Sequence, residues 1–185
     1  MTELSLNILD IAGNSVKARA TLIGITLTET PETLTIEISD NGCGMKPDFL
    51  SRVTDPFTTT RTTRKVGLGI PFFKSEAEQT GGWFSITSRD EETCPTNHGT
   101  VTKALFYKNH LDMLPLGDMP ATLVTLIQGS PEIDFVFTHT FEDKPDISLD
   151  TRQLREILGT LVPLNTPDVL VWIANNIREQ YLERN

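Results

Sequence analysis

Apolar and polar residues follow two different patterns at the beginning of the chain, first a helical one and then an extended one. From residue 3 to about residue 19, apolar residues return every three or four positions, which predicts an amphipathic helix. Residues 21–29 and 34–39 alternate between apolar and polar side chains, which predicts two strands, and the proline-containing stretch 31–33 predicts the turn between them.

Further elements are predicted up to residue 107. A short helix is expected after Pro47, whereas residues 54–66 are rich in threonine and basic residues without an apolar period, which predicts a loop. A helix over 67–80 and strands at 83–88 and 100–107 follow. This order of helix, hairpin, helix, loop, helix and two strands predicts an α+β fold, a two-layer α/β sandwich.

Residues that break helices and strands separate this region from the rest of the chain. Pro115, Gly117 and Pro120 lie close together after the last of these strands. We therefore expect a domain at residues 1–108 and a C-terminal extension at residues 109–185.

The C-terminal extension is predicted to contain a hairpin and two helices. Residues 121–128 and 133–141 are strand-like runs, so this second hairpin either extends the sheet or forms a small separate lobe. Asp150 and Gln153 fit a capping box that opens one helix, and Thr166 precedes a proline at the start of the last helix.

Composition and charge narrow the class of protein. The chain has 185 residues, 38% of them hydrophobic, and no apolar run approaches the roughly 20 residues that cross a bilayer. The N-terminus lacks the pattern of a secretory signal, and Cys43 and Cys94 show neither metal-ligand spacing nor a disulfide framework. We expect a cytoplasmic protein without a membrane partner, and the net charge of −9 argues against a nucleic-acid partner.

Basic residues of this acidic chain gather in one stretch. Between Pro56 and Ser75 there is no acidic residue, which leaves either a solvated basic loop or a lid over phosphate groups. Gly67 and Gly69 open a helix in this stretch, where backbone N–H groups and the helix dipole favour an anion. The basic residues of the stretch are Arg61, Arg64, Lys65 and Lys74.

Two groups of polar residues could carry chemistry. Asp10, Asn14 and Lys17 share one face of the first predicted helix. Asn14 suits Mg²⁺, Lys17 suits phosphate and Asp10 could order or deprotonate a water. Alternatively, this face is only the solvated side of the helix. Asp40 is followed by Gly42 and Gly44, which suits a carboxylate that accepts a hydrogen bond from a flat base, or is only a tight turn.

In this order and spacing, the motifs resemble the GHKL ATP-binding domain, also known as the Bergerat or histidine-kinase-like ATPase fold. The resemblance covers roughly residues 3–107, implies a mixed sheet covered on one face by helices, and is nearest to the ATP-binding domain of sensor histidine kinases. The matching segments are 10–17 (asparagine box), 40–44 (first glycine box), 55–59 (phenylalanine box of sensor kinases), 67–74 (second glycine box), and Gly82, Gly99 and Thr100 (closing elements).

The resemblance implies ATP and Mg²⁺ as ligands and assigns roles by position. Asn14 would coordinate Mg²⁺, Asp40 would bind the adenine amine, and Asp10 would occupy the catalytic position. The residues that the resemblance implies in cofactor binding are Asn14, Lys17, Asp40, Gly42, Gly44, Met45, Phe57, Thr59, Thr60, Arg61, Arg64, Lys65, Gly67, Leu68, Gly69 and Thr100.

Two departures from the family bear on activity. Sensor kinases carry an acceptor histidine on a helix before this domain, and here the asparagine box begins within ten residues of Met1, so we expect either a fragment or a protein that acts on a partner. Asp10 stands where ATP-hydrolysing members carry glutamate; its side chain is shorter by roughly 1.5 Å, which predicts slow hydrolysis. The histidines His98, His110 and His139 are expected on loops and strand surfaces.

The first functional hypothesis is a Mg-ATP-binding protein that transfers phosphate to, or slowly hydrolyses ATP beside, a partner protein of unknown identity. The alternatives are a non-catalytic ATP-dependent switch and an ATP-gated dimerising clamp like the mismatch-repair ATPases. Trp172 and Tyr181 in the last predicted helix either pack in the core or dock the partner.

Overall fold

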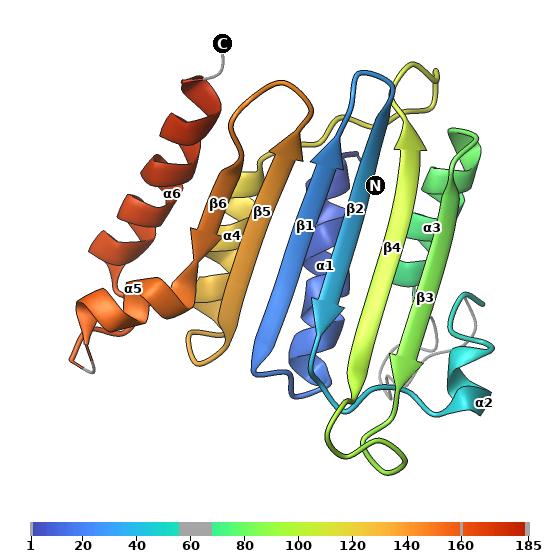
Figure 1. Cartoon of the computed structure of the whole chain (residues 1–185), viewed down its shortest axis with the longest axis horizontal. Coiled ribbons are helices and arrows are strands. Elements are labelled where there is room, and N and C mark those ends of the chain that lie inside the picture. Colours follow the sequence, from blue (N-terminus) through green and yellow to red (C-terminus); the bar gives the residue numbers. More distant parts are fainter. Residues whose placement is uncertain (1, 56–67, 160, 184–185) are drawn as a thin grey trace.

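A six-stranded sheet forms the centre of the molecule (Figure 1). The computed structural model describes residues 2–55, 68–159 and 161–183. The strand order across the sheet is β3-β4-β2-β1-β5-β6. The strands are β1 (Leu22–Glu29), β2 (Thr33–Asp40), β3 (Trp83–Arg89), β4 (Gly99–Tyr107), β5 (Asp134–Phe141) and β6 (Ile147–Asp150).

The sheet is mixed because one of its strand pairs runs parallel. β5 pairs in parallel with β1, from Leu22 opposite Asp134 to Glu29 opposite Phe141, whereas the neighbouring pairs are antiparallel. A parallel pair needs a crossover connection, and the helix between β4 and β5 supplies it. The predicted α+β sandwich with a mixed sheet is confirmed.

Helices α1, α3 and α4 lie behind the sheet as it is drawn in Figure 1, and α6 lies beside β6 at its edge. The other face of β1 to β4 presents mostly threonine, serine and charged side chains and a few exposed apolar ones. The helices are α1 (Leu4–Lys17), α2 (Pro47–Leu50), α3 (Gly69–Gln79), α4 (Met119–Gly129), α5 (Thr151–Leu158) and α6 (Pro167–Leu182).

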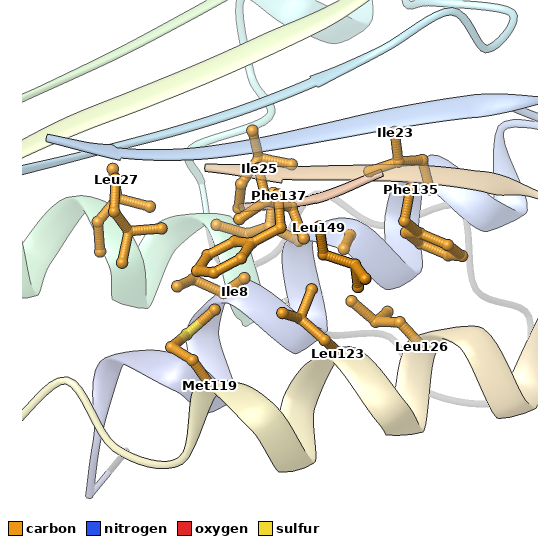
Figure 2. Close-up of a cluster of buried hydrophobic side chains, with 14 of the residues drawn as sticks. Ile8, Ile23, Ile25, Leu27, Met119, Leu123, Leu126, Phe135, Phe137 and Leu149 are labelled. Atoms are coloured by element: carbon orange, nitrogen blue, oxygen red, sulfur yellow. The ribbon is translucent and has the colours of Figure 1, made fainter. Parts of the chain in front are cut away.

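The hydrophobic core fills the space between the sheet and these helices. Figure 2 shows Ile23 and Ile25 of β1 and Phe137 of β5 with their side chains directed toward Ile8 of α1 and Leu123 of α4. All five side chains are fully buried. One continuous cluster therefore joins residues from both sides of the predicted boundary at 108/109.

The prediction of a strand over residues 121–128 is wrong, because these residues lie in α4. Asp118 caps the helix by accepting a hydrogen bond from the backbone N–H of Ala121, and Pro120 lies in its first turn. The buried side chains of Thr122, Leu123, Leu126 and Ile127 return at helical spacing.

The C-terminal hairpin is formed by β5 and β6, and it extends the sheet. Asp150 and Thr166 precede α5 and α6 as predicted. The side-chain amide of Gln180 in α6 donates to the carbonyl of Ser148 and accepts from its N–H, so the helix satisfies backbone groups of the edge strand β6.

The prediction that His139 lies on a loop or strand surface is wrong. His139 of β5 is buried, because its ring points toward the helices. Its Nε2 donates to Glu29 at 3.1 Å, and its Nδ1 lies 2.9 Å from the hydroxyl of Tyr181 in α6. His98 and His110 lie in loops, as predicted. No helix among the described residues is long and apolar enough to cross a membrane.

Candidate functional site

A cavity of about 450 Å³ opens between α1, the inner face of the sheet and the segments that flank α2 and α3. This volume lies in the usual range for small-molecule sites. The structure brings together at this cavity nine of the residues singled out from the sequence: Asp10, Asn14, Lys17, Asp40, Gly44, Met45, Leu68, Gly69 and Thr100.

Asp40 is the most firmly positioned acidic side chain of the cavity. Its Oδ2 accepts a hydrogen bond from the hydroxyl of Ser15 at 2.6 Å, and its Oδ1 accepts one from the backbone N–H of Gly42 at 2.8 Å. Each carboxylate oxygen has a second lone pair, so the group can still accept a bond from a ligand. The fixed orientation reduces the entropy that a bound donor would have to overcome.

The glycine-rich turn after β2 is held in place from both sides. Cys43 donates its backbone N–H to the carbonyl of Ala18 in the α1–β1 connection, at 2.8 Å, and accepts from the N–H of Glu91 at 2.9 Å. Gly44 has a φ of +67°, and a Cβ at this position would lie 1.9 Å from the carbonyl oxygen of Arg89. Only glycine fits there without moving the backbone.

A hydroxyl network connects this turn to β3 and β4. The Oγ of Ser88 accepts the backbone N–H of Met45 at 2.8 Å and lies 3.0 Å from the carbonyl of Gly99 and 2.9 Å from the hydroxyl of Thr100. Ser88 has one hydrogen, which the carbonyl of Gly99 requires, so Thr100 donates to Ser88. The oxygen of Thr100 then keeps lone pairs that can accept in the cavity.

Two helices meet at the other side of the cavity. Asp10, Asn14 and Lys17 lie on one face of α1, and Gly69 begins α3. A Cβ on Gly69 would lie 3.4 Å from the Cβ and 3.5 Å from the Oδ2 of Asp10, so the first residue of α3 lies close to this side chain. The N-terminus of α3 and the cation of Lys17 both line the cavity, and each favours an anion.

The loop between β3 and β4 is fastened to the rim of the cavity. His98 donates its Nδ1–H to the carbonyl of Gly42 at 2.6 Å. Glu92 forms an ion pair with the cavity residue Lys46 at 2.7 Å and raises the pKa of this lysine, and Glu91 pairs with Arg19 at the same distance. The hydroxyl of Thr93 lowers the pKa of Asp90 at the start of the loop.

The remaining predicted residues fall into two groups. Gly42 is buried beside the cavity without lining it and donates to Asp40. Phe57, Thr59, Thr60, Arg61, Arg64, Lys65 and Gly67 lie outside the described residues.

The sequence analysis missed several lining residues, among them Ser15, Ile86 and Thr102. Ser15 directly follows Asn14, so a wider view of the helix face would have included it. Ile86 and Thr102 are opposite each other on β3 and β4, and only the register of the sheet reveals that they are neighbours. The others are Ile11, Ala18, Cys43, Lys46, Phe49, Val53 and Ile70.

The chain belongs to the family of histidine kinase-, DNA gyrase B-, and HSP90-like ATPases, because the sequence profile of this family matches residues 2–108. This confirms the resemblance to the GHKL domain. The match covers more than half of the 185 residues.

Relatives with similar sequences include two putative NtrY-like sensor histidine kinases. The protein of Rickettsia conorii (strain ATCC VR-613 / Malish 7) is 25% identical over 114 residues, which are 61% of this chain and 18% of the relative. The protein of Rickettsia felis (strain ATCC VR-1525 / URRWXCal2) is 25% identical over 93 residues, which are 50% of this chain and 15% of the relative. The chain thus matches less than a fifth of each kinase.

Solved structures with a similar fold include two domains. The N-terminal domain of a DNA repair protein has a TM-score of 0.53 and 19% identity, over 86% of this chain and 58% of that one. The Aquifex aeolicus MutL ATPase domain complexed with ADP has a TM-score of 0.53 and 14% identity, over 85% of this chain and 69% of the MutL chain. Such identities show the fold alone.

Proposed function

We propose that this chain binds ATP together with Mg²⁺ in the cavity and acts on a partner protein, by phosphotransfer to it or by slow ATP hydrolysis beside it. The observation that carries the proposal is the arrangement of the cavity. A fixed carboxylate, Asp40, apolar side chains, the amide of Asn14 and the N-terminus of α3 all border this one cavity.

The side of the cavity around Asp40 suits an adenine ring. Asp40 would accept the hydrogen bond of the exocyclic amine, for which its second lone pairs are available. The oxygen of Thr100 is a further acceptor nearby, directly opposite Asp40 in the β2–β4 pair. Ile86, Met45 and other apolar lining residues would cover the faces of the base.

The side formed by α1 and α3 suits the phosphates. The N–H groups at the start of α3 and the cation of Lys17 would hold phosphate oxygens. The described residues contain no group of three or more His, Cys, Asp or Glu side chains that could hold a metal ion. The donor set fits Mg²⁺ held by one or two side-chain oxygens, from Asn14 and Asp10, together with phosphate and water.

Bound Mg²⁺ would neutralise charge on the transferring phosphate. Asp10 would orient or deprotonate the attacking group, and its position against Gly69 supports this role. Its short side chain is the reason to expect slow turnover when water attacks. The similarity to sensor kinases supports the proposal that the phosphoacceptor of this chain is a protein.

Calorimetric titration with ATP and ADP in the presence of Mg²⁺ tests the binding proposal. Asp40→Asn places an amide that can donate where an acceptor is needed, so we expect nucleotide binding to be lost while the fold remains, as judged by circular dichroism. Equal nucleotide affinity of the wild type and Asp40→Asn would refute the proposal that Asp40 binds the adenine amine.

A second candidate is a nucleotide-dependent switch without turnover, which the aspartate at position 10 favours over a fast ATPase. In this case ATP binding would change a surface for a partner and not the partner's phosphorylation. Labelled ATP incubated with the protein and host lysate separates the two. If the wild type releases or transfers phosphate and Asn14→Ala does not, the catalytic proposal is supported. If the wild type neither releases nor transfers phosphate at full nucleotide occupancy, the switch is supported.

A further inference from the structure

The strand β3 is an edge strand of the six-stranded sheet. Among the described residues β3 pairs with β4 alone, and Figure 1 shows it as the outermost strand on that side, with α2 near its C-terminal end. The opposite edge strand, β6, has four residues, and Gln180 bonds the N–H and carbonyl of Ser148 in it. β3 has seven residues and contains neither proline nor lysine, so it lacks common devices that block edge pairing.

The alternation of the ladder identifies which groups of β3 point outward. Lys108, just after β4, donates its N–H to Glu32 on the β2 side. Even-numbered residues of β4 therefore bond toward β2, and odd-numbered ones bond toward β3. Because Trp83 is opposite Leu105, the odd-numbered residues of β3 bond to β4.

The N–H and carbonyl groups of Phe84, Ile86 and Ser88 consequently point away from the sheet. Among the described residues, no hydrogen bond outside the ladder uses these backbone groups. They form a row of donors and acceptors that a further strand could pair.

The side chains of β3 are complementary to a second copy of the same strand. An antiparallel copy centred on Ile86 is the register that pairs all seven residues, from Trp83 to Arg89. It sets Phe84 opposite Ser88 and Ile86 opposite itself, which are the positions with free backbone groups. Trp83 then faces Arg89 of the second copy, a pair suited to a cation–π contact.

Charge also favours this partner. Arg89 is the only charged residue within β3, and both Trp83 and Arg89 are exposed on the open face of the sheet. The close, non-hydrogen-bonded positions of the pairing hold Trp83 with Arg89 and Ser85 with Thr87 of the second copy. No like charges meet in this register, although each chain carries a net charge of −9.

We propose that two copies of this chain associate through their β3 edges, antiparallel about a twofold axis at Ile86, so that two six-stranded sheets become one. The interface does not require nucleotide, because it is built from backbone groups and from side chains on the open face. Each pair at positions 84/88 and 86/86 exchanges two backbone hydrogen bonds.

Sedimentation velocity with two double variants tests the proposal. Ser85 and Thr87 are exposed and face each other across the twofold axis, so Ser85→Glu with Thr87→Glu places like charges opposite each other. Ser85→Glu with Thr87→Lys differs only at position 87 and places opposite charges there. We expect a dimer of the 20.6 kDa chain for the wild type and for the Glu/Lys variant, and a dissociation constant raised by about tenfold to a hundredfold for the Glu/Glu variant.

Amide hydrogen exchange supplies the second measurement. In the dimer the amides of Phe84, Ile86 and Ser88 are protected, and in the Glu/Glu variant they exchange faster while the amides of Ser85 and Thr87, bonded to β4, stay protected. A wild type that stays monomeric at micromolar concentration overturns the proposal. A dimer equally stable in both variants also overturns it, and nucleotide affinity, measured in parallel, shows that the cavity is intact.

Discussion

The hydroxyl of Ser15 connects the first helix to Asp40. Ser15 is buried, and its bond of 2.6 Å holds the Oδ2 of the carboxylate in place. Under the proposed function, Ser15→Ala is expected to weaken ADP binding about tenfold, because it removes a hydrogen bond to a charged group. Isothermal titration measures this.

Ser5→Ala is the matched control, since Ser5 is a buried serine of the same helix whose hydroxyl donates to Glu3 at 2.8 Å. Both variants are expected to lose about 1 kcal/mol of unfolding free energy. A loss of affinity of the same size in Ser5→Ala would mean that the effect of Ser15 is a general loss of stability and not a specific contact.

Two glycines are expected to respond in opposite directions to alanine. A Cβ on Gly44 would meet the carbonyl of Arg89 in a backbone conformation with positive φ, so Gly44→Ala should cost more than about 1 kcal/mol. Gly13 lies inside α1 with nothing within 4 Å of an added Cβ, so Gly13→Ala should stabilise by roughly 0.5–1 kcal/mol. Urea unfolding of both variants checks the prediction; a stable Gly44→Ala contradicts the strained turn.

Residues of the site with a distinctive local pattern were predictable from the sequence. Asp10, Asn14 and Lys17 follow from helical spacing, and Asp40 and Gly44 follow from a polar break at a strand end. Apolar and small lining residues such as Ile86 carry no local signal, because any inward position of a strand looks alike. Their place at the cavity depends on the sheet register, which is a long-range property.

At the scale of elements, the wrongly predicted strand at 121–128 shows how tertiary context decides an ambiguous segment. Its leucines, valine and isoleucine fit either a strand or a buried helix. Asp118 is a possible helix cap that the sequence analysis does not consider, and Pro120 is interpreted there as part of a domain boundary. The parallel pairing of β5 with β1 requires a crossover at this point, which a hairpin could not provide.

The start of α5 offers a test by pH. Arg152 lowers the pKa of Asp150 mainly through its side-chain hydrogen bonds. The backbone N–H of Arg152, which Asp150 caps, also donates to the carboxylate and lowers its pKa further. Because the folded pKa lies below the unfolded one, the stabilisation is present above the unfolded value and is lost as the pH falls through the folded value. Asp150→Ala should cost about 1 kcal/mol at neutral pH, and this difference should shrink in acid.

Asp150→Asn separates the cap from the charge. Asparagine still accepts the backbone N–H and does not titrate, so it should retain most of the neutral-pH stability and show a weaker acid dependence than the wild type. Urea midpoints of the three proteins over a pH series provide the measurement. An unchanged acid dependence in Asp150→Asn would show that other carboxylates dominate it.

At the scale of the whole molecule, the C-terminal extension and the family domain share their core. Phe135 and Phe137 of β5 and Leu123 of α4 are buried in the same cluster as Ile23 and Ile25 of β1 (Figure 2). The similarity to solved structures extends over 86% of the chain and therefore beyond residue 108. The family profile ends at residue 108, so neither the profile nor the sequence pattern reveals this dependence.

A chain that ends at residue 108 is therefore expected not to fold by itself. It would expose the edge of β1 and the apolar side chains that β5 and α4 cover, and burying a single such side chain is worth about 1.5–3 kcal/mol. The loss should exceed the typical total stability of roughly 5–15 kcal/mol. Thermal melts followed by circular dichroism should show no cooperative transition, and adding residues 109–185 as a separate chain should restore one. A cooperative melt and full ATP affinity for residues 1–108 alone would instead establish the extension as a separable unit.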